Sequence, residues 1–327
     1  MHNCGHCGMH EDVVHEKCRM KNVKQMDIVP GMKAGNLVNE FENSGVFGAG
    51  RIAKAVNIAE SMVKDKDCKV FLGLAGAMVP GGMKNIIIDM LESGMIDVLV
   101  TTGANLTHDL IEALGHNHLQ GSADADDAEL NKDHIDRIYD SFMPNLVYET
   151  MEDFFAEHFD ELAKETAIKD FLWKLGSLVP NEKKSILRTC FEKKIPVFCP
   201  AISDSGIGLM IWGNLAKGKK CGVNAFEDLK EMLDIAWTAK KTGVFYIGGG
   251  VPKNYIQQAM QFSPNAAEYG IQITMDRPEP GGSSGAELKE GISWGKMNKD
   301  AMFVNVICDA TIAVPLIYAA LKDRLGK

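Results

Sequence analysis

Residues 69–105 read KVFLGLAGAMVPGGMKNIIIDMLESGMIDVLVTTGAN, and they contain the unit that the rest of the chain repeats. Val70-Phe71-Leu72 is a short apolar run that leads into a glycine-rich loop from Gly73 to Gly82. A helix is expected from Asn85 to Leu91, and Val98-Leu99-Val100 then begins the same order again. Strands that alternate with helices in this way are typical of α/β proteins with a parallel sheet.

The same unit recurs in the second half of the chain. Three more apolar runs each lead into a polar or glycine-rich turn: Ile195 to Phe198 before Ser203 to Gly206, Val244 to Ile247 before Gly248 to Gly250, and Phe303 to Ile307 before Asp309 to Thr311. Because all five runs are apolar on both faces, we expect a doubly wound, mostly parallel sheet of the Rossmann-like type, with helices on both faces. The loops after the strands then form a ligand crevice at one edge of the sheet.

The loops at this edge favour a dinucleotide ligand. Their glycines would let backbone N–H groups approach a pyrophosphate at helix N-termini, and Asp204 or Asp309 could accept hydrogen bonds from ribose hydroxyls. For each loop alone a tight turn is the simpler explanation, so the prediction depends on all five together. Gly48-x-Gly50-x-x-Ala53 matches the dinucleotide fingerprint only as text, because the polar residues 39–42 precede it where a buried strand is required.

Two other regions complete the organisation of the chain. Residues 122–190 combine an acidic start with helical periodicity, and we interpret them as a helical insertion within a single domain of residues 31–327. Two further helices are expected, near Phe226 to Lys240 and Ile312 to Leu325. Residues 1–30 form a separate segment, which either binds a metal such as zinc or is a mobile tail. Its candidate ligands are His2, Cys4, His6, Cys7, His10, His15 and Cys18.

Composition excludes several classes of protein. A net charge of -9 argues against a nucleic-acid-binding protein, which needs basic patches to meet phosphates. No apolar run reaches the roughly 18 residues of a membrane span, and the N-terminus lacks the apolar segment of a signal peptide. We therefore expect a cytoplasmic protein that does not enter a membrane, with its 8 cysteines as free thiols.

Gly291-Ile292-Ser293-Trp294-Gly295-Lys296 is the candidate reactive segment. It places a lysine beside a tryptophan, downstream of the Gly/Ser-rich loop Gly281 to Gly285. A lysine that forms imines must be neutral, and a dry pocket with an aromatic wall lowers the pKa of a lysine. The alternative is a surface lysine beside a half-buried tryptophan.

These stretches together carry a family resemblance. From about residue 32 to the end, the chain resembles the deoxyhypusine synthase family, and more closely its deoxyhypusine synthase-like branch in archaea and bacteria. The matching stretches, in family order, are Phe71 to Gly73, Val98 to Thr102, Pro200 to Asp204, Gly248 to Gly250, Ser284-Gly285, Ser293 to Lys296 and Asp309-Ala310.

The resemblance implies a mechanism and a set of site residues. In the family, NAD takes a hydride from a secondary amine of spermidine, the imine passes to a lysine, and the aminobutyl group moves to an acceptor amine. Lys296 matches the nucleophile, Trp294 the aromatic wall and Glu290 the nearby acid. The family forms homotetramers with active sites across subunit interfaces. The implied cofactor-binding positions are Gly76, Ala77, Pro80, Thr102, Gly103, Ala104, Asp204, Gly249, Met275, Asp276, Asp309 and Ala310.

The substrate-binding positions depart from the family pattern. Leu209 and Ser283 stand where the family has acids, Asn254 where it has a proton-handling histidine, and His108 where it has a glutamate; Ser284 is retained. Losing two carboxylates removes charge-assisted hydrogen bonds worth about 1.5 to 3 kcal/mol each to a substrate ammonium. His108 either replaces the missing histidine as the base or is a helix-start histidine bonded to its neighbours.

The resulting hypothesis is an NAD-dependent aminoalkyl transferase that acts on a polyamine through an imine on Lys296. Its acceptor is either a protein lysine or a small diamine, as in homospermidine synthesis, and the departures favour a small acceptor or an altered donor. The alternative is a non-catalytic NAD-binding protein with a degenerate polyamine site.

Overall fold

A computed structural model describes residues 21–326, so the candidate metal ligands between His2 and Cys18 lie outside the described residues. The central sheet has six strands, and every pair of neighbours is parallel. Its strands are β1 (Cys68–Leu74), β2 (Val98–Thr101), β6 (Val197–Phe198), β7 (Lys241–Ile247), β8 (Ala267–Thr274) and β9 (Met297–Ile307). The spatial order is β6-β2-β1-β7-β8-β9.

This order is that of a doubly wound fold. The chain builds outward from β1 in one direction through β2 to β6, then returns and builds in the other direction from β7 to β9. The strand order therefore reverses between β1 and β7, the topological switch point where ligands bind in such folds. All five predicted strands are in the sheet, which confirms the predicted fold class.

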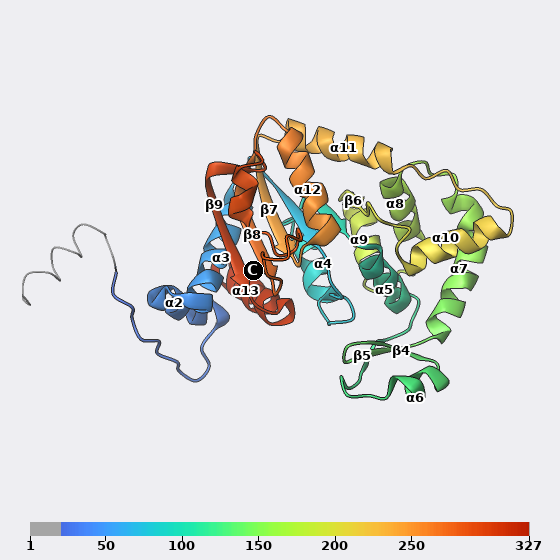
Figure 1. The fold of residues 1–327 in the computed structure, drawn as a ribbon, viewed down its shortest axis with the longest axis horizontal. Coiled ribbons are helices and arrows are strands. Elements are labelled where there is room, and N and C mark those ends of the chain that lie inside the picture. Colours follow the sequence, from blue (N-terminus) through green and yellow to red (C-terminus); the bar gives the residue numbers. More distant parts are fainter. Residues whose placement is uncertain (1–20, 327) are drawn as a thin grey trace, which may run out of the picture.

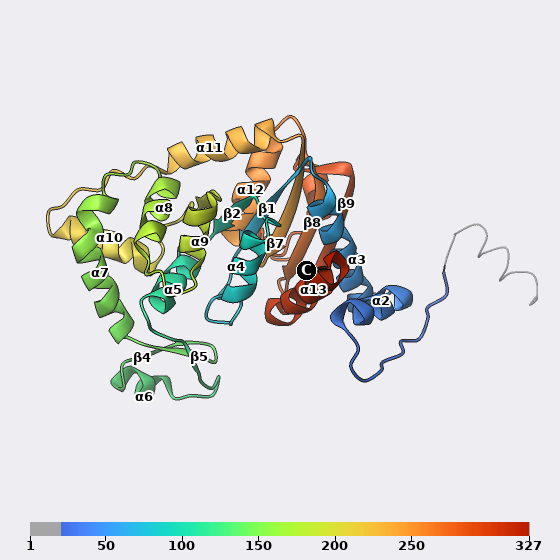
Figure 2. The same ribbon diagram turned by 180° about the vertical axis from the view of Figure 1, so that it is seen from behind.

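Helices cover both faces of the sheet, as the views from the two sides show (Figures 1 and 2). Those outside the 122–190 segment are α2 (Ala34–Ser44), α3 (Phe47–Lys64), α4 (Lys84–Glu92), α5 (Gly103–Ala113), α10 (Gly206–Ala216), α11 (Ala225–Thr238), α12 (Gly250–Phe262), α13 (Ala310–Leu325) and the 3-10 helix η1 (Leu288–Ile292). Alternate residues of β1 enter two different cores: Val70 and Leu72 pack in the core with α3, α4 and α13, whereas Phe71 packs in the core with α11 and α12. Burial of both faces explains why the strands are apolar throughout.

Strand β8 was not predicted from the sequence. It reads AEYGIQIT and lies between β7 and β9, with Gln272 only 1% exposed. The polar Glu268 and Gln272 interrupt the apolar run that identified the other strands. Gln272 is buried because its side chain has hydrogen-bond partners in the candidate active site, described below.

The predicted insertion, residues 122–190, lies between β2 and β6, and this part of the chain contains more than helices. Its helices are α6 (Asp127–Lys132), α7 (Leu146–Leu162), α8 (Ile168–Leu178) and α9 (Ile186–Lys193). A small antiparallel sheet, β3 (Leu119–Gln120), β5 (Ser141–Pro144) and β4 (Ile135–Ile138), accompanies them. The buried Asp109 on α5 anchors the insertion, because its carboxylate accepts hydrogen bonds from Ser185 Oγ and the N–H groups of Ile186 and Leu187 at the start of α9.

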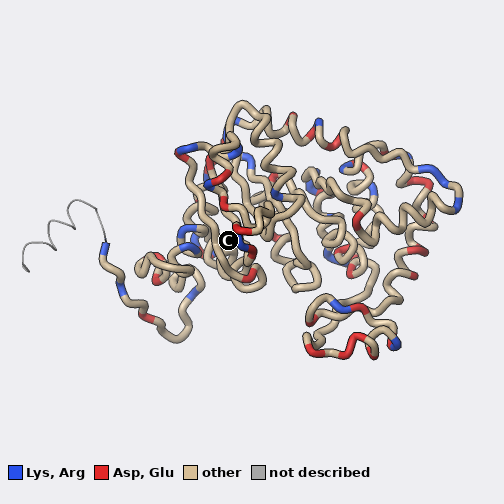
Figure 3. The backbone as a smooth tube through the Cα atoms, in the orientation of Figure 1, with Lys and Arg blue, Asp and Glu red and all other residues tan. Residues whose placement is uncertain are grey.

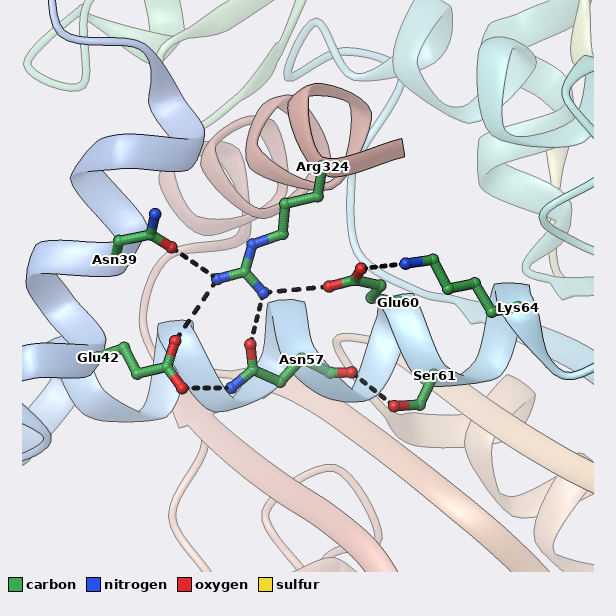
Figure 4. Close-up of polar contacts among 7 residues, drawn as sticks. All are labelled: Asn39, Glu42, Asn57, Glu60, Ser61, Lys64 and Arg324. Carbon is green, nitrogen blue, oxygen red and sulfur yellow. Dashed lines mark hydrogen bonds and ion pairs between the residues drawn. The ribbon is translucent and has the colours of Figure 1, made fainter. Parts of the chain in front are cut away.

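Arg324 joins the end of α13 to the two N-terminal helices (Figure 4). Its guanidinium donates to Asn57 Oδ1 at 2.5 Å and Glu60 Oε2 at 3.3 Å on α3. It also donates to Asn39 Oδ1 at 3.1 Å on α2 and lies 3.6 Å from Glu42 Oε2. Because α13 begins at the carboxyl edge of the sheet, this network helps to fix a helix that borders the candidate site.

Charges of both signs are interspersed over most of the fold, with acidic residues gathered around α6 (Figure 3). Within residues 21–326, none of the helices combines the length and the hydrophobicity needed to span a bilayer. The five cysteines in this part of the chain, Cys68, Cys190, Cys199, Cys221 and Cys308, are free thiols, as predicted.

Candidate active site

A cavity of about 440 Å³ lies where the strand order reverses. The carboxyl ends of β1, β7, β8 and β9 and the loops that follow them provide its walls. Six of the predicted cofactor-binding residues line it: Gly76, Gly249, Met275, Asp276, Asp309 and Ala310. Ser284 of the Gly/Ser-rich loop and Cys308 also line it. Parallel pairing explains this convergence, since it brings these sequence-distant loops to one edge.

The glycines after β7 fit a close-approaching phosphate group. Gly248 and Gly250 have φ angles of +74° and +58°, which side chains disfavour. A Cβ on Gly249 would lie 2.3 Å from Ser284 Cα, so a larger residue would push the neighbouring loop away. Gly249 is also the N-cap of α12, and it has no side chain to occupy the helix N–H groups. This N-terminus is therefore suited to bind an anion such as a pyrophosphate.

Two carboxylates stand at the rim of the same cavity. Asp309 Oδ1 caps α13 by accepting hydrogen bonds from Thr311 N and Oγ1, both at 2.7 Å. Asp276 follows β8, and its N–H donates to Thr274 Oγ1 at 3.1 Å. Both side chains are exposed and both can accept hydrogen bonds from ribose hydroxyls. These acceptors and the glycine-lined helix N-terminus thus fit a dinucleotide.

The remaining predicted cofactor residues lie outside the lining of this cavity, in the loops after β1 and β6 and at the start of α5, which follows β2. They are Ala77, Pro80, Thr102, Gly103, Ala104 and Asp204. Asn105 connects the start of α5 to the loop after β1, since its Oδ1 accepts a hydrogen bond from Met78 N at 3.1 Å. They share the carboxyl edge of the sheet with the cavity.

A second, smaller pocket of about 160 Å³ contains the candidate nucleophile. Lys296, Trp294 and Glu290 line it together with Asn254 and Ser283, so five predicted residues converge here. Lys296 Nζ lies 4.8 Å from the centroid of the Trp294 ring, within range of a cation–π contact. Trp294 is 56% exposed, which leaves the other side of this aromatic wall open.

Lys253 is a further lysine of this pocket, and the sequence analysis missed it. It is only 5% exposed, and burial lowers its pKa to about 8; Glu290 opposes this shift and Lys296 adds to it. The signal in the sequence was weak: Lys253 directly precedes Asn254 and follows the three glycines.

The Gly/Ser-rich loop separates the two cavities. Ser284 lines the cofactor cavity, whereas Ser283 and Ala286 line the lysine pocket. The loop thus provides one wall to each.

His108 on α5 belongs to a chain of polar contacts that extends to Lys84 on α4 and to His118, which follows α5. Lys84 pairs with Glu112, Glu112 Oε1 lies 2.8 Å from His118 Nδ1, and His118 Nε2 lies 2.9 Å from His108 Nδ1. If His118 is neutral and donates to Glu112, its Nε2 accepts from His108 Nδ1, which leaves a lone pair on His108 Nε2. Burial lowers the pKa of His108 to about 4. His108 lies outside the lining of the lysine pocket.

Leu209 lies in a different part of the chain from the lysine pocket. It is on α10, where it lines a cavity of about 570 Å³ with Trp212, Tyr148 and Glu152. Leu209 and Trp212 are 56% and 66% exposed. Both views place α10 at the end of the molecule away from β9 (Figures 1 and 2). Within one chain, Leu209 and Lys296 therefore do not share a pocket.

Comparisons with known proteins identify the family of the chain. The family model described as deoxyhypusine synthase matches residues 36–321. "Probable deoxyhypusine synthase 1" of Methanosarcina mazei is 46% identical over 306 residues, which covers 93% of this chain and 96% of the relative. The protein of the same name from Archaeoglobus fulgidus is 42% identical, with 93% and 99% covered.

A solved structure shows the same fold. The crystal structure of a candidate deoxyhypusine synthase from Entamoeba histolytica has a TM-score of 0.64 at 19% identity, with 91% of this chain and 96% of that chain covered. At that identity the likeness concerns the fold alone. From the family match and the identity to the archaeal relatives, the chain belongs to the deoxyhypusine synthase family, whose members are transferases.

Proposed function

We propose that the protein is an NAD-dependent transferase that moves an aminobutyl group from a polyamine such as spermidine to an acceptor amine through an imine on Lys296. One observation carries the proposal. Lys296, Trp294 and Glu290 line a pocket that a single loop separates from a cavity suited to a dinucleotide. Family membership supports aminobutyl transfer, and the cofactor and the covalent lysine are our inference from the site.

Each residue has a role in this reaction. NAD, when bound in the glycine-lined cavity, supplies the acceptor for a hydride from the carbon beside the secondary amine of the donor. Trp294 offers its ring face to the cationic chain, and Glu290 offsets its positive charge. The Lys296 amine replaces the leaving amine, which for spermidine is 1,3-diaminopropane, by exchange at the imine carbon. The acceptor amine then replaces Lys296, and return of the hydride completes the transfer.

Two acceptors are compatible with this chemistry. The family supports a protein lysine, as in deoxyhypusine synthesis. Leu209 and Ser283 stand in place of two acids, and Asn254 stands in place of a histidine. The loss of these ionisable groups from the expected polyamine site favours a small diamine acceptor or a different donor. Incubation with a purified translation factor tests this choice: a gain in its mass would establish the protein acceptor, whereas a new triamine would establish the small one.

We further propose that the active enzyme is a homo-oligomer, specifically a homotetramer, with sites shared between subunits. Leu209 on α10 and Lys296 are predicted to face one substrate but line separate cavities of one chain. A second copy would bring the α10 surface of one subunit to the lysine pocket of another. The exposed Trp212 and Leu209 give that surface an apolar contact area.

A second candidate function is an NAD-binding protein without turnover. The replaced polar residues at Leu209, Ser283 and Asn254 favour it, because they weaken recognition of a substrate ammonium. Retention of Lys296 beside Trp294 favours the enzyme, since a passive binding protein has no need of a nucleophile there.

The deciding experiment is intact mass spectrometry after incubation with NAD and spermidine, putrescine, homospermidine or agmatine, followed by borohydride reduction. We expect an adduct that requires NAD and maps to Lys296. Lys296→Ala should abolish it, whereas Lys289→Ala, which changes an exposed lysine on η1 outside the pocket, should retain it. Demonstrable NAD binding with no adduct from any of the four amines would favour the non-catalytic protein.

A further inference from the structure

The ammonium group of Lys253 donates hydrogen bonds to three acceptors within the protein. Its Nζ donates to Gln272 Oε1 at 2.9 Å, to the carbonyl of Ser283 at 2.7 Å and to the carbonyl of Ala286 at 2.5 Å. An ammonium group has three N–H donors, so these three acceptors use its full capacity. With a pKa of about 8, Lys253 carries the charge for these bonds at neutral pH.

Gln272 supports the same loop from β8. Its Oε1 accepts from Lys253, and its Nε2 donates to the carbonyl of Ser284 at 2.8 Å. Two buried side chains thus hold the carbonyls of Ser283, Ser284 and Ala286. Gln272 and Lys253 are 1% and 5% exposed, and buried polar groups of this kind are costly unless they are bonded.

Besides these side-chain bonds, the loop has turn bonds from the N–H groups of Gly285 and Ala286 to the carbonyl of Gly282, and Ser283 Oγ donates to the carbonyl of Gly250 at 3.3 Å. The loop contains Gly281, Gly282 and Gly285 and belongs to neither a helix nor a strand. Glycine-rich backbone loses the most conformational freedom on ordering, so such a loop needs specific contacts to keep one shape. Ser284 of this loop packs directly against Gly249, and both residues line the cofactor cavity.

We propose that Lys253 is a positioning residue which, with Gln272, holds the 281–286 loop as the common wall of the cofactor cavity and the lysine pocket. The inference rests on the proposed function, because hydride transfer needs the nicotinamide ring and the donor carbon in direct contact, and the loop that borders both cavities sets where these two groups can meet. Lys253 does this through the loop and needs no contact with substrate. Its role differs from that of Lys296, whose amine bonds to the substrate carbon.

The test separates the cofactor-dependent step from the reactivity of Lys296. Lys253→Met keeps a flexible unbranched side chain but removes all three donors. In the NAD-dependent assay with an amine donor, we expect the initial rate of adduct formation at Lys296 to fall about tenfold to a hundredfold, as small misplacements do. Direct trapping of butanal on Lys296 with cyanoborohydride needs no hydride transfer to NAD, and its rate should stay within about threefold of wild type.

Controls make each outcome decisive. Lys289→Met, which changes an exposed lysine of η1 outside the pocket, should match wild type in both assays. Hydrogen exchange of a peptide spanning the loop should be about tenfold faster in Lys253→Met, whether or not the protein turns over an amine. Unchanged exchange, a wild-type NAD-dependent rate, or equal losses in both assays in a folded variant would overturn the positioning role. If wild type forms no NAD-dependent adduct, the proposed function fails, and loop exchange still decides whether Lys253 holds the wall.

Gln272 provides an independent check of the same inference. Gln272→Met removes the bond to Ser284 and one acceptor of Lys253, so it should lower the NAD-dependent rate in the same direction. Because both residues hold one loop, the double variant should lose less than the product of the single losses. Fully multiplicative losses would show that the two side chains act separately.

Discussion

At the residue scale, His108 couples the charge state of the α5 region to pH. Burial lowers its pKa from 6.5 to about 4, with a smaller contribution from His118 in the same direction. Glu112 opposes the shift. His108 is therefore neutral at pH 7 and can act as a hydrogen-bond acceptor, the state that a base requires.

This shift predicts a pH-dependent stability. Between pH 6.5 and 4 the unfolded chain binds a proton at this histidine that the folded chain does not, so the free energy of unfolding falls as pH falls. The loss should reach on the order of 2 to 3 kcal/mol at pH 4, and His108→Gln should remove it. Urea unfolding of both proteins from pH 7.5 to 4.5 measures the difference. Parallel curves for the two proteins would contradict the assignment.

At the element scale, α13 connects the N-terminal helices to the cofactor cavity. It begins at Ala310 in the cavity lining and ends near Arg324, which bonds to α2 and α3. Arg324→Met should lower the free energy of unfolding by about 1 to 3 kcal/mol, because it leaves several partly buried acceptors without a charged donor.

A matched control is available on the same network. Lys64→Met removes the exposed i, i+4 pair with Glu60 and should cost no more than about 0.5 kcal/mol. Chemical denaturation of both variants measures the two effects. Equal losses in the two variants would show that the Arg324 network is no stronger than an ordinary surface ion pair.

At the scale of the whole molecule, the exposed apolar surface of α10 bears on assembly. Trp212→Glu places a charge at the centre of the proposed subunit contact, so it should shift the protein to smaller species and reduce NAD-dependent adduct formation at Lys296. Phe262→Glu, at the far end of α12, changes a side chain of similar exposure (65% against 66%) and should leave both properties unchanged. Sedimentation velocity at several concentrations measures the first effect. A tetramer that persists in Trp212→Glu would exclude α10 from the contact.

The sequence by itself was sufficient to predict the fold class, because five strands buried on both faces leave continuous apolar runs. It also predicted that Lys296, Trp294 and Glu290 belong together, since they lie within seven residues of each other. The loops after β7 and β9 were predictable as neighbours because parallel strands bring their carboxyl ends to one edge, whereas Met275 and Asp276 after β8 were predicted only from the family resemblance. Strand β8 escaped prediction because polar Gln272 interrupts its pattern.

Only the tertiary structure identified Lys253 and Gln272 as neighbours. They lie on α12 and β8, and their contacts with the 281–286 loop depend on three segments that meet in space. It also placed Leu209 and Lys296 in separate cavities. Local periodicity records which faces of an element are buried, but not which distant side chain supplies a partner. The charged group of Lys253 is buried because acceptors from distant parts of the chain bind it. The sequence alone therefore did not identify this lysine.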